Sequence, residues 1–349
     1  MKANRDEIEL LIAMARRRPG AIGPRLLESC RAGDVDWERF HRIAEAERVA
    51  PIVRRNLLDH PEFCDFLPAD AMRAFDWTWR RNKAVKTARI AKTAEVANWF
   101  DQRGIRVMLI KGGAIDQVIY EEPWLTTSDD VDLIIDRESA AMPADWWPEL
   151  CRSLGEPRSI EMDCARHHDL DMNGILDIDY ERLWRDARPL AMGDSRVWVM
   201  SLQDLMIAAC IQFCRRRYSR LKEACAIAEI LELHGDLDWS ALAAEARRAG
   251  ADRIVATSLV VVRSLLRCEI PSGALDALPI GLLTRVSSAG LRSFLLAKVD
   301  GRPPARRETI AGFGLKFLSI RPSRWPDWLR KSRRFRNLSV LDQANPIPS

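Results

Sequence analysis

Apolar residues recur at helical spacing through the first hundred residues of the chain. A stripe of apolar side chains every three or four positions is typical of a helix that buries one face. Glycine and proline separate several of these stripes, and such residues commonly end helices. The helices predicted in this way cover residues 5–17, 37–49, 51–60 and 69–100. We expect residues 1–100 to form an N-terminal helical region.

The pattern changes between residues 101 and 200, where apolar runs become short. Residues 107–110 form one run, and residues 133–135 form another. Short apolar runs next to glycine and turn residues are typical of buried strands. The alternation of apolar and acidic residues over 175–180 predicts a further strand, and residues 196–200 predict one more. A helix is expected near residues 146–154.

Helical spacing returns after residue 201 and predicts a C-terminal helical domain over residues 201–300. The helices expected there cover residues 205–213, 221–233, 239–250 and 254–267. Residues 301–349 form a tail rich in proline, arginine and tryptophan. A short strand-rich segment between two helical regions indicates an α+β fold.

The composition is that of an ordinary globular protein, with 47% hydrophobic residues. No apolar run approaches the roughly 18 residues that a membrane span needs. The first 20 residues mix acidic residues into their apolar segment and lack a signal-peptide core, so we expect a cytoplasmic protein. The eight cysteines form no C-x-x-C pair and are expected to be buried reduced thiols.

Positive charge is concentrated near the C-terminus. Residues 302–336 contain 11 Lys or Arg and two acidic residues, whereas the rest of the chain has 43 basic and 48 acidic residues. Trp325 and Trp328 lie within this basic segment. Such a segment can bind nucleic acid by charge and stacking. It can also dock on its own fold or on an anionic membrane, and the sequence leaves these alternatives open.

Acidic pairs on the predicted strands suggest a metal site. Alternate residues of a strand share a face, so Asp130 and Asp132 are expected to project together, and so are Asp177 and Asp179. Like charges on one face need a compensating cation, and a divalent metal is the obvious candidate. Lys111, with the glycines after it, could supply positive charge and close backbone approach for phosphates.

This inventory suits nucleotidyl transfer, in which carboxylates hold metal ions about 3.5–4 Å apart around the reacting phosphate. Three sequence motifs carry a resemblance: L-I-K-G-G-A at 109–114, D-D-V-D-L-I-I at 129–135 and D-I-D-Y at 177–180. The chain resembles the uncharacterised bacterial nucleotidyltransferase family, a branch of the polymerase-beta-like superfamily. The resemblance extends over about residues 35–270.

The resemblance implies a small mixed-sheet nucleotidyltransferase palm at residues 101–200, which uses Mg²⁺ or Mn²⁺ and a nucleoside triphosphate (NTP). Asp130 and Asp132 match the family's D-x-D metal ligands. Lys111, Gly112 and Gly113 match its K-G turn, which holds the triphosphate.

The third carboxylate is left open by the sequence. Where the family often has an acid, an aliphatic residue, a His and an aromatic residue, this chain has Asp177, Ile178, Asp179 and Tyr180. In that alignment Asp177 is the ligand and Asp179 replaces the His. Both are expected on the same strand face, so either could complete a site with Asp130 and Asp132.

Two departures from the family pattern motivate alternatives. Thr126 stands where an Arg usually precedes the D-x-D, and Gly113-Ala114 stand where the wider superfamily has a Ser. One alternative is a non-catalytic binding module for a peptide, protein or nucleic acid. Another is a toxin that nucleotidylates tRNA or protein. The acceptor of an active enzyme could be a small molecule, a peptide, a protein or RNA.

Two further groups could contribute to such a site. His167 and His168 are adjacent, and adjacent side chains of a strand point apart, which disfavours joint metal binding. The basic residues at 215–217 and Arg220 fit a solvated helix end, and a contact with phosphate or the acceptor is the alternative.

Overall fold

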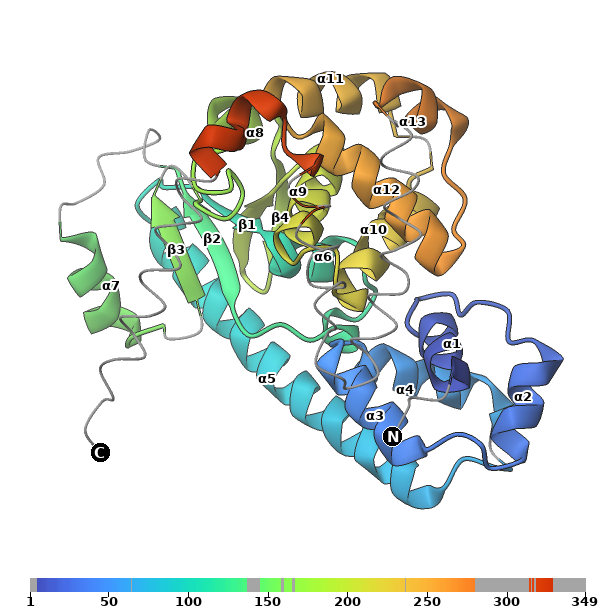
Figure 1. The fold of residues 1–349 in the computed structure, drawn as a ribbon. Helices are drawn as coiled ribbons and strands as arrows, with labels where there is room; N and C mark the ends of the chain where they lie inside the picture. The colour runs from blue at the N-terminus through green and yellow to red at the C-terminus, as the bar shows by residue number, and fades with distance from the viewer. Residues whose placement is uncertain are drawn as a thin grey trace, which may run out of the picture.

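The computed structural model describes residues 5–63, 65–136, 145–157, 160–164, 167–235, 237–279, 314, 316 and 318–328. Its first part is helical, as predicted. The helices there are α1 (Arg5–Met14), α2 (Pro24–Arg31), α3 (Trp37–Ala46), α4 (Ala50–Asp59) and α5 (Ala69–Asp101), with a 3-10 turn at Pro61–Phe63. The α5 helix is a long rod that passes the sheet at one end and meets the other N-terminal helices at its far end (Figure 1).

The centre of the molecule is a five-stranded mixed sheet with the order β3-β2-β1-β5-β4. Its strands are β1 (Val107–Ile110), β2 (Val131–Ile135), β3 (Ile160–Cys164), β4 (Arg188–Met192) and β5 (Ser195–Val199). The central strand β1 is antiparallel to β2 and parallel to β5. The β3 strand runs parallel to β2, and β4 is antiparallel to β5.

The two faces of the sheet differ in chemistry. Leu109 and Leu133 are directly paired and therefore share a face. This apolar face is covered by α5 and by α6 (Lys111–Val118), because Leu109, Val131 and residues of both helices line a common small cavity. The opposite face carries Asp132, which is paired with Glu161 of β3.

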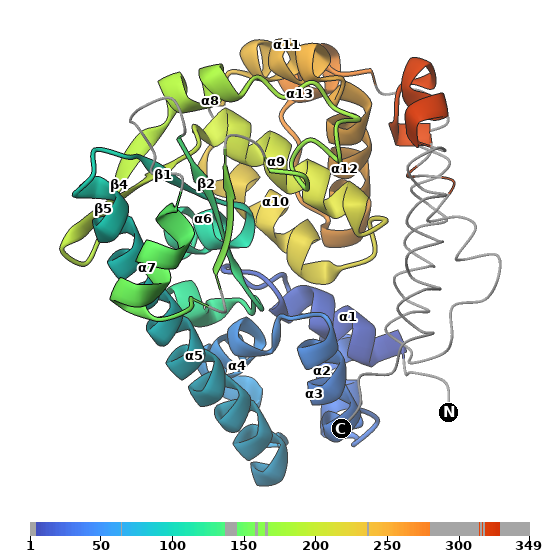
Figure 2. The ribbon, with the colours of Figure 1, turned by 90° about the vertical axis from the view of Figure 1, so that its left-hand side faces the viewer.

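The C-terminal helices pack together on the other side of the molecule from the far end of α5 (Figure 2). They are α9 (Leu202–Arg215), α10 (Leu221–Leu233), α11 (Trp239–Ala249), α12 (Asp252–Leu266) and α13 (Ser272–Ala277). The helices α7 (Trp146–Leu154) and α8 (Tyr180–Asp186) belong to the connections of the sheet. Among the described residues, no helix combines the length and the hydrophobicity that crossing a membrane requires.

The basic tail at 302–336 lies largely outside the described residues. The part at 318–328, red in Figure 1, packs on the protein itself. Ser319 is buried and accepts a hydrogen bond from Tyr218 at 2.7 Å, and Arg321 pairs with Asp252 at 3.0 Å. Trp328 is also buried. The described part of the tail therefore docks on its own fold.

The predicted α+β class is confirmed, and the strands expected at 107–110, 133–135 and 196–200 are present. The strand expected at 175–180 was wrong. Residues 175–179 form a loop that ends where Asp179 caps α8, with the Asp179 carboxylate accepting a hydrogen bond from the Arg182 amide at 2.9 Å. Alternate burial of this loop produced the strand-like pattern. The cysteines follow the prediction, since the six whose side chains are described are unpaired and all but Cys151 are buried.

A buried ion pair joins the two helices on the apolar face. The ammonium of Lys86 in α5 bonds the carboxylate of Asp116 in α6, and both side chains are nearly inaccessible to solvent. Burial lowers the pKa of Lys86, although the nearby Asp116 charge opposes this effect. Removing one member of a buried pair leaves an uncompensated charge, which is strongly destabilising.

We therefore expect Lys86→Met to lower the free energy of unfolding by about 3 kcal/mol. Adding Asp116→Asn to this variant should recover part of the loss, because the buried charge is then removed as well. Urea unfolding followed by circular dichroism measures both effects. A Lys86→Met protein as stable as the parent would contradict the assignment of this pair.

Candidate active site

A cavity of about 350 Å³ lies over the acidic face of the sheet, between the start of α6 and the helices α9 and α10. Its volume is within the range of ligand pockets. Acidic and basic side chains from regions far apart in the sequence line it. These titratable lining residues are Arg48, Lys111, Asp130, Asp132, Glu161, His168, Asp169, Arg215, Arg216, Lys222 and Glu223.

Three carboxylates line the sheet side of the cavity. Asp130 precedes β2, Asp132 lies within β2, and Glu161 is the direct neighbour of Asp132 on β3. Burial raises the pKa of Glu161, and the negative charges of Asp132 and Asp130 raise it further. Crowded carboxylates of this kind share protons or bind a cation. Their oxygens are also the donors that Mg²⁺ prefers, so the donor set fits a divalent metal.

Lys111 occupies the junction of β1 and α6. It has a positive φ of 51°, a conformation that non-glycine residues rarely adopt and that is often found at functional sites. Its ammonium lies 2.6 Å from both Asp132 Oδ1 and Asp169 Oδ2. Arg215 also pairs with Asp169. In this arrangement Lys111 supplies the positive charge closest to Asp132.

Asp132 is held in its ionised form. Burial alone would raise its pKa, but a hydrogen bond from His167 and the charge of Lys111 outweigh burial and hold the pKa below the usual value. The pKa of Asp169 is lowered in the same way: burial is opposed by the hydrogen bond from Lys111 and the charge of Arg215. Both carboxylates are therefore available as anions at neutral pH.

Gly112 and Gly113 allow close packing. Neither has a positive φ, because in this turn the positive φ is that of Lys111. A Cβ atom on Gly113 would lie 2.8 Å from Leu109 Cδ1, so Gly113 lets α6 approach the apolar face of the sheet. A Cβ atom on Gly112 would lie 3.4 Å from Lys222 Nζ, on the cavity side. The structure therefore places Lys111 and Gly112 on the cavity and Gly113 beneath it.

The loop at 126–129, which leads into Asp130, is held by side chains from three regions. Asn82 of α5 donates to the carbonyls of Trp124 and Thr126 at 2.6 and 2.9 Å. Lys222 of α10 donates to the Thr127 carbonyl at 2.8 Å. Arg89 of α5 donates to the Ser128 carbonyl, and Arg48 pairs with Asp129.

Thr126 has a structural role at the position where the family usually has an Arg. Its side chain is buried, and its hydroxyl donates to the Asp116 carboxylate that also binds Lys86. Thr126 and Asn82 together therefore brace this loop.

Lys222 lacks a counter-ion within the described part of the chain. Its ammonium lines the cavity and uses one of three N–H bonds on the Thr127 carbonyl. Lys111, Arg48 and Arg215 all pair with carboxylates. Lys222 is therefore available to bind an anion beside Gly112.

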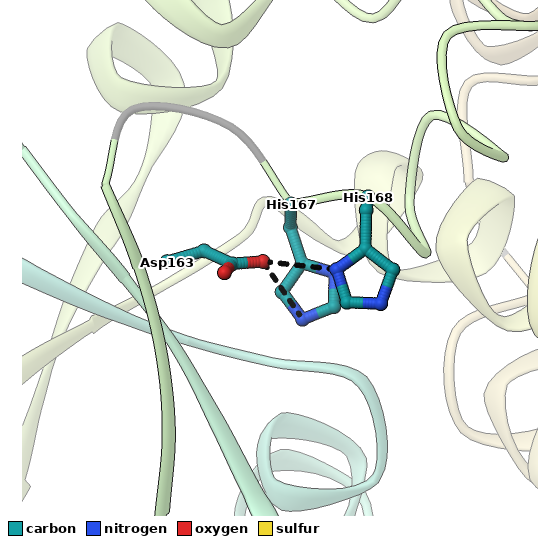
Figure 3. Close-up of side chains that lie close together, drawn as sticks. All are labelled: Asp163, His167 and His168. Carbon is teal, nitrogen blue, oxygen red and sulfur yellow. Dashed lines mark hydrogen bonds and ion pairs between the residues drawn. The ribbon is translucent and has the colours of Figure 1, made fainter. Parts of the chain in front are cut away.

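His167 and His168 lie in the loop after β3, and their rings stack at 5.1 Å with an angle of 8° between them (Figure 3). The expectation that adjacent histidines point apart does not apply, because they do not lie in a strand. Asp163 Oδ2 lies 3.8 Å from His167 Nε2 and 3.3 Å from His168 Nδ1. His167 Nε2 also lies 3.3 Å from Asp132 Oδ1. His167 therefore belongs to two groups whose possible ligand atoms lie within 4.8 Å of one another, one with Asp132 and Glu161 and one with Asp163 and His168.

Asp177 and Asp179, the sequence-based candidates for the third carboxylate, do not line this cavity. Asp177 is largely exposed and pairs with Arg324 of the tail. Asp179 caps α8. The expected strand would have brought them beside Asp132, but that position belongs to Glu161.

Sequence reasoning missed Glu161, Asp169 and Lys222. A signal existed for Glu161, because residues 160–164 alternate apolar and acidic side chains as residues 175–180 do. No such signal marks Lys222, since a single lysine at a helix start is usually solvated. For residues 215–217 the sequence left two interpretations open, and the structure places Arg215 and Arg216 on the cavity.

The fold and the family match define a class, the α+β nucleotidyltransferases. A family of uncharacterised nucleotidyltransferases matches residues 33–145 and 156–267, more than half of the chain. The chain belongs to that family. No curated protein and no solved structure matches it.

The contrast between the two glycines gives a test of the packing. Gly113→Ala should lower the free energy of unfolding by about 1–3 kcal/mol, because the new methyl group overlaps buried Leu109. Gly112→Ala, the matched control, faces only the end of a flexible lysine and should change stability less. Thermal unfolding compares the two. Equal destabilisation would contradict the different surroundings assigned to them.

Proposed function

We propose that this protein is a metal-dependent nucleotidyltransferase that moves a nucleoside monophosphate from an NTP to an acceptor hydroxyl or phosphate and releases pyrophosphate. The observation that carries the proposal is one cavity that combines Asp130, Asp132 and Glu161 with Lys111, Gly112 and Lys222. Membership of the nucleotidyltransferase family supports it.

The carboxylates of Asp130, Asp132 and Glu161 would hold Mg²⁺ or Mn²⁺. Glu161 takes the place proposed from the sequence for Asp177 or Asp179, because it is the acid adjacent to Asp132. A bound divalent ion would neutralise charge on the triphosphate and on the attacking oxygen. Asp132 is already ionised, which suits it to this task.

The triphosphate would lie along the start of α6. Backbone N–H groups at a helix N-terminus have no partners within the helix and favour anions. Gly112 allows phosphate oxygens to approach closely, and the Lys222 ammonium lies on the same side. Lys111, held by Asp169, would add a second cation.

In the proposed reaction an acceptor oxygen attacks the α-phosphorus, and the bond from this phosphorus to the bridging oxygen of the β-phosphate breaks. The electron pair of that bond leaves with pyrophosphate. A cavity carboxylate accepts the proton of an acceptor hydroxyl. Positioning and charge neutralisation supply most of the rate gain for such transfers.

Incubation with each α-³²P-labelled NTP, Mg²⁺ or Mn²⁺, and cell extract should label an acceptor, and the size of the product identifies its class. Asp130→Asn with Asp132→Asn should abolish labelling. The double variant should also bind Mn²⁺ about 100-fold more weakly or worse, since even the outer partners of metal ligands are worth 10–100-fold. Asp177→Asn serves as the matched control and should retain labelling. Labelling that survives the double substitution would overturn the proposal.

Lys222→Gln should weaken NTP binding by about 10–100-fold, because a hydrogen bond to a charged group contributes about 1.5–3 kcal/mol. The loss should be larger for the triphosphate than for the monophosphate of the same nucleoside. Isothermal titration calorimetry measures both ligands. Lys92→Gln, on α5 and outside the cavity, should bind like the parent. An equal loss for both ligands would place Lys222 elsewhere than on the outer phosphates.

A further inference from the structure

We infer that His167 is a positioning residue that donates a hydrogen bond to Asp132 through Nε2, and that Tyr180 holds His167 in place for this purpose. The inference rests on the proposed function of Asp132 as a metal ligand. It assigns His167 a supporting role in preference to direct coordination.

The tautomer of His167 follows from its neighbours. The amide N–H of Asp169 donates to His167 Nδ1 at 3.1 Å, so Nδ1 carries a lone pair. Nε2 is then the donor atom of the ring, and it faces Asp132 Oδ1 at 3.3 Å. A ring that ligates a metal through Nε2 would need its proton on Nδ1. That Nδ1 proton would face the Asp169 N–H, and two donors cannot form a hydrogen bond with each other.

The bond to Asp132 has a direct consequence for the metal site. Lys111 and His167 both donate to Oδ1, which leaves the second oxygen, Oδ2, to a bound cation. Outer partners of this kind fix the orientation of a ligating carboxylate. Because the His167 side chain is almost fully buried, it cannot drift away from Asp132 into solvent.

Tyr180 fixes the backbone from which this ring extends. Its hydroxyl accepts a hydrogen bond from the His167 amide at 3.0 Å and donates one to the His167 carbonyl at 3.0 Å. Tyr180 is the first residue of α8, whose start is capped by Asp179. The D-I-D-Y motif thus acts on the site through His167 and not by supplying a ligand.

Two clusters offer a competing interpretation in which His167 itself ligates a metal: Asp132, Glu161 and His167 form one, and Asp163, His167 and His168 form the other (Figure 3). The Nδ1 contact of His167 disfavours it. His168 is also engaged on both sides, with Asp163 at Nδ1 and Asp169 at Nε2, each at 3.3 Å. The two interpretations therefore predict different effects on metal binding when each histidine is substituted.

The first test needs no metal. The chain has five histidines, so long-range ¹H–¹⁵N spectra of the full-length protein labelled at histidine give five ring patterns, and the pattern lost in His167→Asn belongs to His167. We expect a proton on Nε2 and a lone pair on Nδ1, as the contact with the Asp169 amide requires. A proton on Nδ1 would overturn the inference, whatever the fate of the proposed function.

The second test measures Mn²⁺ affinity by electron paramagnetic resonance. His167→Asn keeps an acceptor for the Asp169 amide and loses the donor to Asp132, and it should weaken Mn²⁺ binding about 10-fold. His167→Gln can place an N–H near the position of Nε2 and should recover most of the affinity. Tyr180→Phe, which keeps the His167 ring, should fall between these two.

His60→Asn, in the N-terminal part of the chain and outside the cavity, is the matched control and should bind Mn²⁺ like the parent. His168→Asn should lose less affinity than His167→Asn, because the contacts of the His168 ring are with Asp163 and Asp169 and not with Asp132. A loss in His168→Asn equal to that in His167→Asn, or strong hyperfine coupling of Mn²⁺ to a histidine nitrogen, would overturn the inference in favour of direct coordination. A parent protein that shows the Nε2–H tautomer but binds no Mn²⁺ supports the assigned hydrogen bond and rejects only the proposed function.

Discussion

The structure depends on how the loop at 126–129 is held immediately before Asp130. Side chains from α5 and α10 donate to its carbonyls, and Arg48, between α3 and α4, pairs with Asp129. A short loop cannot satisfy its own polar groups, so partners from other regions fix its path. The position of Asp130 and the start of β2 are thereby tied to the N-terminal and C-terminal helices together. The helical regions on either side of the sheet are part of the site.

Several charged side chains of the cavity are linked by consecutive ion pairs. Asp132 is balanced by Lys111, Lys111 is shared with Asp169, and Asp169 is shared with Arg215. Burial and the charges of Asp132 and Asp130 raise the pKa of Glu161. Lys222 has no ion pair among the described residues. The proposed metal–nucleotide complex would bring a cation to Glu161 and phosphate anions to Lys222.

The sequence predicted the long helices and the central strands well, because their apolar stripes report burial directly. It misplaced the third acidic strand for a physical reason. Alternating exposure also arises in loops that lie on a core, and the segment at 175–179 begins in a turn and is not paired to the sheet. The true neighbour of β2, β3, shows the same alternation. Deciding between them requires the register of the strands, which no local pattern encodes.

The two neighbours of β1 in the sheet are synthesised at different times. These neighbours, β2 and β5, come from very different points of the sequence, and the second is completed only at Val199. While the polypeptide is being synthesised, the hydrophobic strand beside Lys111 has one unpaired edge, and such edges promote aggregation. Lys222, which closes the loop before Asp130, emerges from the ribosome later still. The cavity can therefore be closed on this side only after the start of α10 has been synthesised.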